Sequence, residues 1–262
     1  MSTTDLLQLC RRLLDTDAVP VTWHPGHAGP QVLCASTAEH GEVIVKPHRS
    51  HKRHTQEVHA YRTWVRALGD RAPRLLAATD DPPAIVITAL PGIPLSQRKL
   101  NPEAERDAYR QVGQLLRTLH DARPPRLEPD WTAWLAERAE YWLHQAGARI
   151  TPSYRAEVRA HMRALQDLAP LPTVPCHLDF MPRNMIYDDG VVHLIDFEHS
   201  RYDLPARDLV RLATRVWPMR PDLRSSFLES YGLLTTADLE VVIHSRYLDE
   251  LTRSLSGTTI PK

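Results

Sequence analysis

The chain has 262 residues, enough for one large domain or two lobes, so it can bury an extensive core without disulfide bonds. Its 32 basic and 32 acidic residues balance, which excludes a global field that would attract nucleic acid or an anionic membrane. Three widely spaced cysteines form neither a disulfide framework nor a zinc-binding pattern, and no stretch approaches the roughly 20 uncharged apolar residues of a membrane span. We therefore expect a soluble, cytoplasmic monomer that binds neither nucleic acid nor a membrane.

The first third of the chain is expected to form a small sheet. After an N-terminal helix, residues 21–46 carry valine, isoleucine and threonine in short runs separated by turn sequences, a pattern that predicts three antiparallel strands. Residues 52–68 have apolar side chains at helical spacing, and residues 84–90 form a short apolar run that is typical of a buried strand. This part is therefore rich in strands and contains one helix within them.

Residues 91–94, Pro-Gly-Ile-Pro, interrupt this pattern, and most of the chain after them is expected to be helical. Asn101 and Thr151 each precede a proline, which is typical of the first residues of a helix. Residues 174–197 are expected to return to short strands around a loop. Three closing helices are expected over residues 205–217, 222–231 and 236–255.

The strongest chemical signal is a loop followed by a hairpin. His177, Asp179 and Asn184 have the spacing H-x-D-x-x-x-x-N, and a turn at 188–190 would return Asp196 to the same loop. Phosphoryl transfer needs a carboxylate near the acceptor hydroxyl and oxygen ligands that fix Mg²⁺ on the phosphates. The alternative is that these side chains only cap a turn, as aspartate and asparagine often do.

A second signal is a lysine at the end of a strand of β-branched residues. Lys46 follows Val43-Ile44-Val45, and buried lysines are rare without a partner. Glu57 lies on the next predicted helix, on the same stripe as three apolar residues, so its carboxylate is expected to point inward and to need a cation. The alternative is a solvated lysine at a strand edge.

These motifs, with Ile-Asp-Phe at 195–197, resemble those of the aminoglycoside phosphotransferase and choline kinase family. The resemblance implies an α+β protein-kinase-like fold with two lobes. Residues 1–90 would form a small nucleotide-binding lobe with an antiparallel sheet and one helix. Residues 91–262 would form a larger, mainly helical catalytic and substrate-binding lobe, with the hinge at about 88–95.

The resemblance also implies roles for single residues. Asp179 would be the catalytic base and would act with Asn184, while Asn184 and Asp196 would be the ligands of Mg²⁺. Lys46 would hold the α and β phosphates of ATP or GTP, and Glu57 would orient this lysine.

The predicted hinge would bind the nucleotide base through its backbone. By the same resemblance, Ile87 is the gatekeeper, and Thr88 and Leu90 offer the backbone groups. Any buried strand before Pro-Gly looks similar, and backbone groups do not choose between ATP and GTP. Asp208 is expected to brace the backbone of the catalytic loop.

Two departures from the family pattern affect the phosphates. The loop before the strand lysine offers only Gly26 and Gly29, so the glycine-rich loop that would cradle phosphates is missing. Met181 stands where related kinases carry a lysine or a histidine two residues after the catalytic aspartate. Arg183 or Arg201 would then supply the cation for the γ-phosphate.

Histidines at 48, 51, 54 and 59 raise the alternative of a metal site, since histidine is a common ligand of transition metals. Arg49, Lys52 and Arg53 interleave with them, and no cysteine or carboxylate completes a familiar spacing. A solvated basic loop is therefore the preferred interpretation.

The acceptor is expected to be a small hydroxylated molecule. Residues 96–262 contain 22 basic and 23 acidic residues, not the acidic excess that a polycationic aminoglycoside would favour. Trp131 and Trp134 lie on one face of a helical segment, 131–142, either as core residues or as a platform for a flat ring.

The predicted function is therefore O-phosphorylation of an antibiotic, for resistance or self-protection. A nucleoside antibiotic of the capuramycin type is one candidate acceptor. The alternatives are a kinase of a small metabolite such as choline, a sugar or homoserine, and an inactive nucleotide-binding sensor.

Overall fold

The computed structural model describes residues 3–24, 31–128, 130–168 and 170–255. Its backbone contacts divide it into two compact units, so far as their residues are described. Unit 1 contains Met1–Ala104 and Pro182–Arg201, and unit 2 contains Glu105–Met181 and Tyr202–Lys262. The predicted division into a nucleotide-binding lobe, 1–90, and a catalytic lobe, 91–262, stays a prediction. The compact units do not follow this boundary, because residues 182–201 belong to unit 1.

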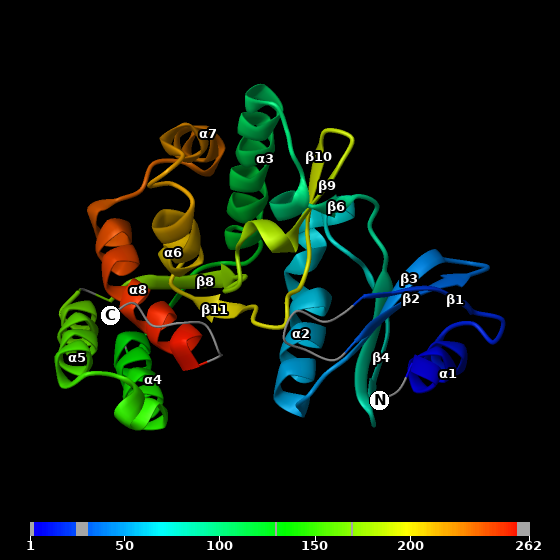
Figure 1. Cartoon of the computed structure of the whole chain (residues 1–262), viewed down its shortest axis with the longest axis horizontal. Coiled ribbons are helices and arrows are strands. Elements are labelled where there is room, and N and C mark those ends of the chain that lie inside the picture. The colour runs from blue at the N-terminus through cyan, green and yellow to red at the C-terminus, as the bar shows by residue number, and fades with distance from the viewer. Residues whose placement is uncertain (1–2, 25–30, 129, 169, 256–262) are drawn as a thin grey trace. The chain divides into compact units, whose positions relative to one another are not determined.

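Unit 1 is built on a five-stranded antiparallel sheet, of which Figure 1 labels β1, β2, β3 and β4. The strand order is β1-β2-β3-β5-β4. The strands over 21–46 and 84–90 were expected, but β4 was missed because its sequence, Leu-Leu-Ala-Ala-Thr-Asp, lacks the β-branched alternation of the others. Their bounds are β1 (Val19–His24), β2 (Val32–Thr37), β3 (Gly41–Pro47), β4 (Leu75–Asp80) and β5 (Pro83–Thr88).

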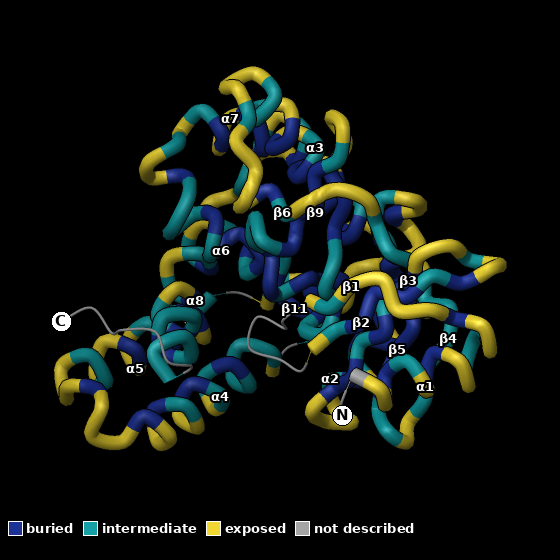
Figure 2. The backbone as a smooth tube through the Cα atoms, turned by 45° about the vertical axis from the view of Figure 1, so that its right-hand side comes forward, coloured by how far each residue is buried: buried dark blue, intermediate teal, exposed yellow. Residues whose placement is uncertain are grey.

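Helices cover both faces of this sheet. Leu6, Leu9 and Cys10 of α1 (Thr3–Leu13) share one buried cluster with Val43, Val45 and other residues of β2, β3 and β5. The helix α2 (His51–Thr63) contacts β4 and β5, and the predicted helix continues only as a 3₁₀ segment, η1 (Val65–Arg71). The inner strands are buried, whereas most of β1 is exposed (Figure 2).

A second sheet of unit 1 contains the predicted hairpin. Its strand order is β10-β9-β6, with β6 (Ile93–Pro94), β9 (Met185–Asp188) and β10 (Val191–Leu194). Gly92 has a φ of +100°, and a Cβ atom there would lie 2.4 Å from the Tyr187 carbonyl oxygen, so this approach requires glycine. Pairing of β6 with β9 explains why 182–201 fold with unit 1. The short 3₁₀ segments η2 (Leu95–Gln97) and η4 (Pro182–Asn184) accompany this sheet.

Unit 2 is mainly helical, as expected, and the α+β class is confirmed. Asn101 and Thr151 cap their helices: Asn101 Oδ1 accepts from Ala104 N at 2.9 Å, and Thr151 Oγ1 accepts from Tyr154 N at 3.1 Å. The helices are α3 (Pro102–His120), α4 (Trp131–Ala146), α5 (Pro152–Gln166), α6 (Ala206–Arg215), α7 (Pro221–Tyr231) and α8 (Thr236–Leu255).

The core of unit 2 joins α4, α5 and α8, which bury Leu135, Leu143, Val158, Met162 and Leu248 in one cluster. The 3₁₀ segment η3 (Gly147–Arg149) follows α4. A small sheet has the strand order β11-β8-β7, in which β7 and β8 pair antiparallel. Its strands are β7 (Arg126–Leu127), β8 (Pro172–Cys176) and β11 (Arg201–Asp203). Within the described ranges, no helix has the length and apolar character that crossing a bilayer requires.

Candidate active site

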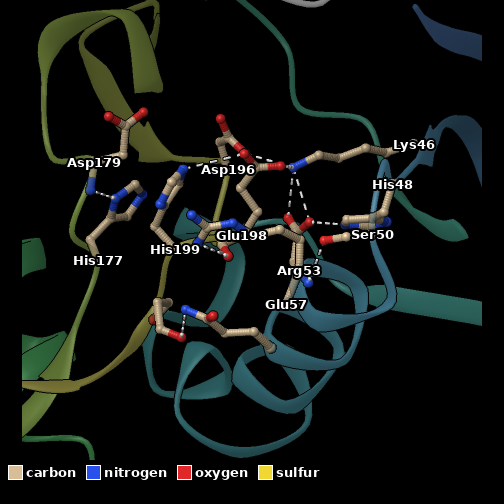
Figure 3. A network of polar contacts seen from close by, with 12 residues as sticks. Lys46, His48, Ser50, Arg53, Glu57, His177, Asp179, Asp196, Glu198 and His199 are labelled. Carbon is tan, nitrogen blue, oxygen red and sulfur yellow. Dashed lines mark hydrogen bonds and ion pairs between the residues drawn. The ribbon is translucent and has the colours of Figure 1, made fainter. Parts of the chain in front are cut away.

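The strand β3 directs Lys46 toward α2. Successive side chains of a strand point to opposite faces, so Val43 and Val45 face α1 while Lys46 faces the other way. The Lys46 ammonium lies 3.1 Å from Glu57 Oε1, 2.9 Å from Glu57 Oε2 and 2.6 Å from Asp196 Oδ1 (Figure 3). The predicted pairing of Lys46 with Glu57 is confirmed, and the alternative of a solvated lysine is excluded.

Three carboxylates hold Lys46 in its charged form. Its desolvation lowers the pKa, but Glu57, Asp196 and Glu198 outweigh this, so the pKa of Lys46 lies well above its ordinary value. Glu198 Oε2 is 3.4 Å from the ammonium. A hydrogen bond with His199, followed by the charge of Lys46, keeps the pKa of Glu198 well below its usual range. Lys46 and Glu198 therefore stay ionised at neutral pH.

His48 completes the surroundings of Glu57, which is fully buried. The pairing of β3 with β5 continues past Pro47, since His48 N donates to Pro83 O at 2.8 Å. His48 therefore lies two residues beyond Lys46 on the same face, and its Nε2 is 2.6 Å from Glu57 Oε2. His54 is buried too, with Nε2 3.2 Å from Ala84 O.

The prediction of a solvated basic loop is therefore wrong for His48 and His54, which are buried. Arg49 and Lys52 are exposed as expected, but Lys52 lies on α2 and not in a loop. Ligand atoms of His48, Glu57 and Glu198 do lie within 4.8 Å of one another. The Lys46 ammonium contacts both carboxylates, however, so the positive charge at this place is already supplied by the chain.

The hairpin joins Asn184 and Asp196 at its open end. Asn184 directly precedes β9 and Asp196 follows β10 by two residues, and Ile195 N donates to Asn184 O at 3.0 Å. Asn184 is buried, and Asp196 has a φ of +69°, a conformation that few residues other than glycine adopt. An amide oxygen and a carboxylate are ligands that Mg²⁺ accepts, so these two residues fit the metal in their chemistry.

The predicted hinge residues lie at the end of β5. Ile87 is buried and pairs with Ile44 of β3, on the face that Lys46 shares. Thr88 N already donates to Arg74 O at 3.0 Å, so Thr88 can offer a base only its carbonyl oxygen. Leu90 is half-buried, and its backbone makes no hydrogen bond with the part of the chain that the structure describes.

The loop that carries Asp179 in unit 2 is held by Asp208, as predicted. Asp208 accepts hydrogen bonds from His177 N at 2.8 Å and from Leu178 N at 2.5 Å, and its Oδ2 lies 3.0 Å from His120 Nε2. Leu178 has a φ of +63°, so these bonds hold a backbone conformation that leucine rarely adopts. His177 is buried and its Nδ1 accepts from Asp179 N at 3.2 Å (Figure 3), which agrees with a structural role.

Asp208 is ionised in this place. Its burial raises the pKa, but the hydrogen bond and charge of His120 and the backbone N–H of His177 outweigh burial, so the pKa of Asp208 lies below its ordinary value. Because a carboxylate only accepts, the Nε2 of His120 carries the proton of their hydrogen bond. The loop that carries Asp179 is thus fixed from α3 and α6.

Arg211, on α6, is a residue that the sequence analysis missed. Its Nη1 forms an ion pair with Asp179 Oδ1 and lies 4.0 Å from Met181 Sδ. Its Nε donates to Asp249 Oδ1 at 2.8 Å, and Arg215 Nη2 binds the other oxygen of Asp249 at 2.5 Å. The Nη2 of Arg211 has no hydrogen bond to the described residues, so two of its N–H donors remain available.

A cation therefore lies beside Met181, although residue 181 does not supply it. The predicted candidates lie elsewhere in the chain: Arg183 is half-buried on η4, and Arg201 begins β11. The predicted phosphate loop with Gly26 and Gly29 falls on 25–30, outside the described residues.

The tryptophans of α4 pack on the core of unit 2 and also stack on each other. Trp131 and Trp134 have ring centroids 4.7 Å apart, and Trp131 Nε1 donates to Asp203 Oδ1 at 3.0 Å. Both are partly buried against the cluster of α4, α5 and α8. Their contacts favour the interpretation as core residues over that of a ligand platform.

Residues 25–242 match the model of a family described as "phosphotransferase enzyme family". Two curated relatives are homoserine kinases. That of Gluconobacter oxydans (strain 621H) is 30% identical over 63% of this chain and 54% of its own length. That of Cupriavidus pinatubonensis (strain JMP 134 / LMG 1197) is 32% identical over 45% of this chain and 36% of its own length. The chain thus spans about half or less of these relatives.

Solved structures share the fold at low sequence identity. An aminoglycoside-3'-phosphotransferase of type VIII has a TM-score of 0.66 and 22% identity, over 95% of this chain and 98% of its own. The choline kinase from Cryptosporidium parvum Iowa II also has a TM-score of 0.66, with 13% identity over 97% and 90%. The streptomycin-ATP-APH(2")-IIa ternary complex has a TM-score of 0.69 and 14% identity, over 97% and 89%. The predicted resemblance and kinase-like fold are confirmed.

Asp208→Asn is expected to destabilise the protein at neutral pH, because one amide oxygen replaces two carboxylate oxygens that accept three hydrogen bonds. The free energy of unfolding in urea at pH 7 should fall by about 2–4 kcal/mol. Because the folded-state pKa of Asp208 lies below the unfolded value of about 3.9, its contribution is complete above that value and is lost as pH falls through the folded-state pKa. The difference between wild type and variant should therefore shrink below about pH 4.

Asp107→Asn is the matched control, because Asp107 makes only exposed hydrogen bonds, to Arg110 and Gln111. Its effect should stay below about 1 kcal/mol. An Asp208→Asn effect no larger than this, or one that grows on acidification, contradicts the bracing role of Asp208.

Proposed function

Because the chain belongs to the phosphotransferase enzyme family, we propose that it transfers the γ-phosphate of ATP or GTP to a hydroxyl group of a small molecule. The observation that carries this proposal is the pairing of Lys46 with both Glu57 and Asp196 in unit 1. Polyphosphate binding needs a fixed cation beside a metal-binding carboxylate, and this pairing supports it.

The residues of unit 1 would bind the nucleotide. Glu57, held by His48, fixes Lys46, which would bind the α and β phosphates. Asn184 and Asp196 would hold Mg²⁺, which neutralises charge on the phosphates when bound. Ile87, the carbonyl of Thr88 and the backbone of Leu90 would contact the base, and Arg183 remains a candidate for the phosphates.

Asp179 would be the catalytic base. It would accept the proton of the acceptor hydroxyl as the bond from that oxygen to the γ-phosphorus forms, while the bond to the nucleoside diphosphate breaks and the electron pair leaves with it. Arg211 would keep the Asp179 carboxylate in one orientation, because Asp249 and Arg215 fix the guanidinium in turn. Its unused Nη2 donors would stabilise negative charge on the phosphoryl group.

We place a small metabolite alcohol such as homoserine first among acceptors. The curated relatives that match by sequence are homoserine kinases, whereas the antibiotic phosphotransferases share only the fold. The near-neutral residues 96–262 also suit a small zwitterion better than a polycation. Since the chain spans about half of the first relative, the acceptor is part of the proposal.

An antibiotic acceptor, with resistance or self-protection as its consequence, is the second candidate. The antibiotic phosphotransferases among the solved structures support it through the fold that they share with this chain. Mass spectrometry of homoserine, choline, sugars, aminoglycosides, macrolides and nucleoside antibiotics, each incubated with ATP or GTP and Mg²⁺, tests both. One added phosphate identifies the acceptor, while nucleotide binding without transfer to any of them favours an inactive sensor module.

Asp179→Asn should lower kcat for the acceptor found by at least about 100-fold, because the amide cannot accept the proton, with little change in nucleotide affinity. Lys46→Met should instead weaken nucleotide binding by about 10-fold or more, through loss of charge-assisted hydrogen bonds. Steady-state kinetics and calorimetric titration of ADP measure the two effects. Asp107→Asn is the control for both. Full turnover in Asp179→Asn would refute the assignment of the base.

Arg211→Met should reduce kcat by about 100-fold through loss of the charge beside Asp179. Exogenous guanidinium should restore part of the lost rate in this variant, because a free cation can occupy the same place, and it should not activate Asp179→Asn. Arg215→Met, which removes only the outer contact to Asp249, should be affected less. If guanidinium does not restore the rate, and if Arg215→Met loses as much kcat as Arg211→Met, the role of Arg211 is only structural.

A further inference from the structure

Unit 1 contains a cavity that none of the proposed catalytic residues lines. It lies between the C-terminal half of α2, η1 and the edge strand β4, with a volume of about 530 Å³. This volume lies within the roughly 300–1,000 Å³ of small-molecule sites. Residues 73–78 form one wall, where Leu75, Leu76 and Ala77 are half-buried.

The cavity carries three positive charges and no negative one. Arg62, Arg66 and Arg74 line it, and no aspartate or glutamate does. In the described parts of the chain, the side chains of these arginines make no hydrogen bond and no ion pair. Elsewhere in the protein, arginines such as Arg117 and Arg159 bind a carboxylate with two nitrogens. The guanidinium groups at the cavity are thus available to an anion, which arginine binds in the same paired geometry.

Tyr61 also lines the cavity, and only 3% of it is exposed. Its hydroxyl group is itself buried, close enough to Glu57, Lys46 and Asp196 for their charges to act on it. The donors that the cavity offers to an anion are therefore those of its arginines.

The charge and the apolar wall together define the ligand. Three arginines favour a doubly charged anion, and residues 75–78 can cover an organic group. We propose that this cavity binds an organic phosphate monoester. The site is separate in its residues from Lys46, Asn184 and Asp196.

One packed side chain links this site to the residues around Asp196. The Tyr61 ring contacts Phe197, with centroids 5.5 Å apart, and Phe197 directly follows Asp196. Tyr61 also lies one turn after Glu57 on α2. A ligand in the cavity would therefore touch the helix that holds Lys46 in place.

Calorimetric titration of phenyl phosphate at about 0.15 M salt tests the proposal, since this salt screens unspecific attraction. The wild type should bind one equivalent saturably. Arg62→Gln/Arg74→Gln should weaken binding by about 10-fold or more, because two charge-assisted contacts are lost. Arg49→Gln/Lys52→Gln is the matched control: it removes two exposed charges of unit 1 outside the cavity and should change affinity less than 2-fold.

Three results would overturn the proposal. They are no saturable binding to the wild type, unchanged binding to Arg62→Gln/Arg74→Gln, and equal loss in the control, which would mean general electrostatic attraction. Thermal unfolding of each variant checks that it folds, and Arg66→Gln/Arg74→Gln replaces the first pair if it does not. None of these measurements requires nucleotide or acceptor, so they stand apart from the test of phosphoryl transfer.

Discussion

The arrangement of unit 1 depends on burying the carboxylate of Glu57. A carboxylate removed from water costs several kcal/mol unless charge and hydrogen bonds compensate for it, roughly as much as a domain's whole margin of stability. Lys46 supplies the charge and His48 supplies a hydrogen bond, and both come from the same face of one strand. This requirement fixes α2 against the sheet, and it leaves the lysine ammonium beside Asp196.

Unit 2 also buries a carboxylate, that of Asp208, and compensates for its burial with a different set of hydrogen-bond partners. Asp208 is buried where two backbone N–H groups and an imidazole converge, and it thereby holds Leu178 in an unfavourable backbone conformation. A strained residue persists only where its surroundings outweigh its cost, which is typical of functional loops. Each unit thus uses one buried carboxylate to fix one segment of the proposed active site: the strand with Lys46 in unit 1 and the loop with Asp179 in unit 2.

The sequence predicted what depends on local pattern. Capping residues indicated the starts of α3 and α5, β-branched runs indicated β2, β3 and β5, and the turn at 188–190 indicated the hairpin that joins Asn184 to Ile195.

Prediction from the sequence was wrong or incomplete where tertiary contacts determine the structure. The strand β4 has a helix-like composition and exists because β5 pairs with it. His48 looked like part of a basic loop, and its burial follows from backbone pairing beyond Pro47. Arg211 is one of many arginines in the chain, and only folding of unit 2 brings it to Asp179; its position three residues after Asp208 was the available signal.

The chain path between the units has a consequence for biosynthesis. The strand with Lys46 is made early, whereas its partner Asp196 lies 150 residues later, in the segment 182–201 that folds with unit 1. A ribosome would therefore release residues 1–104 long before β9 can pair with β6, and the intervening 77 residues of unit 2, 105–181, emerge first. Unit 1 consists of two separate stretches of the sequence, so a fragment that ends at residue 104 lacks the hairpin. Its lysine would retain Glu57 and lose Asp196.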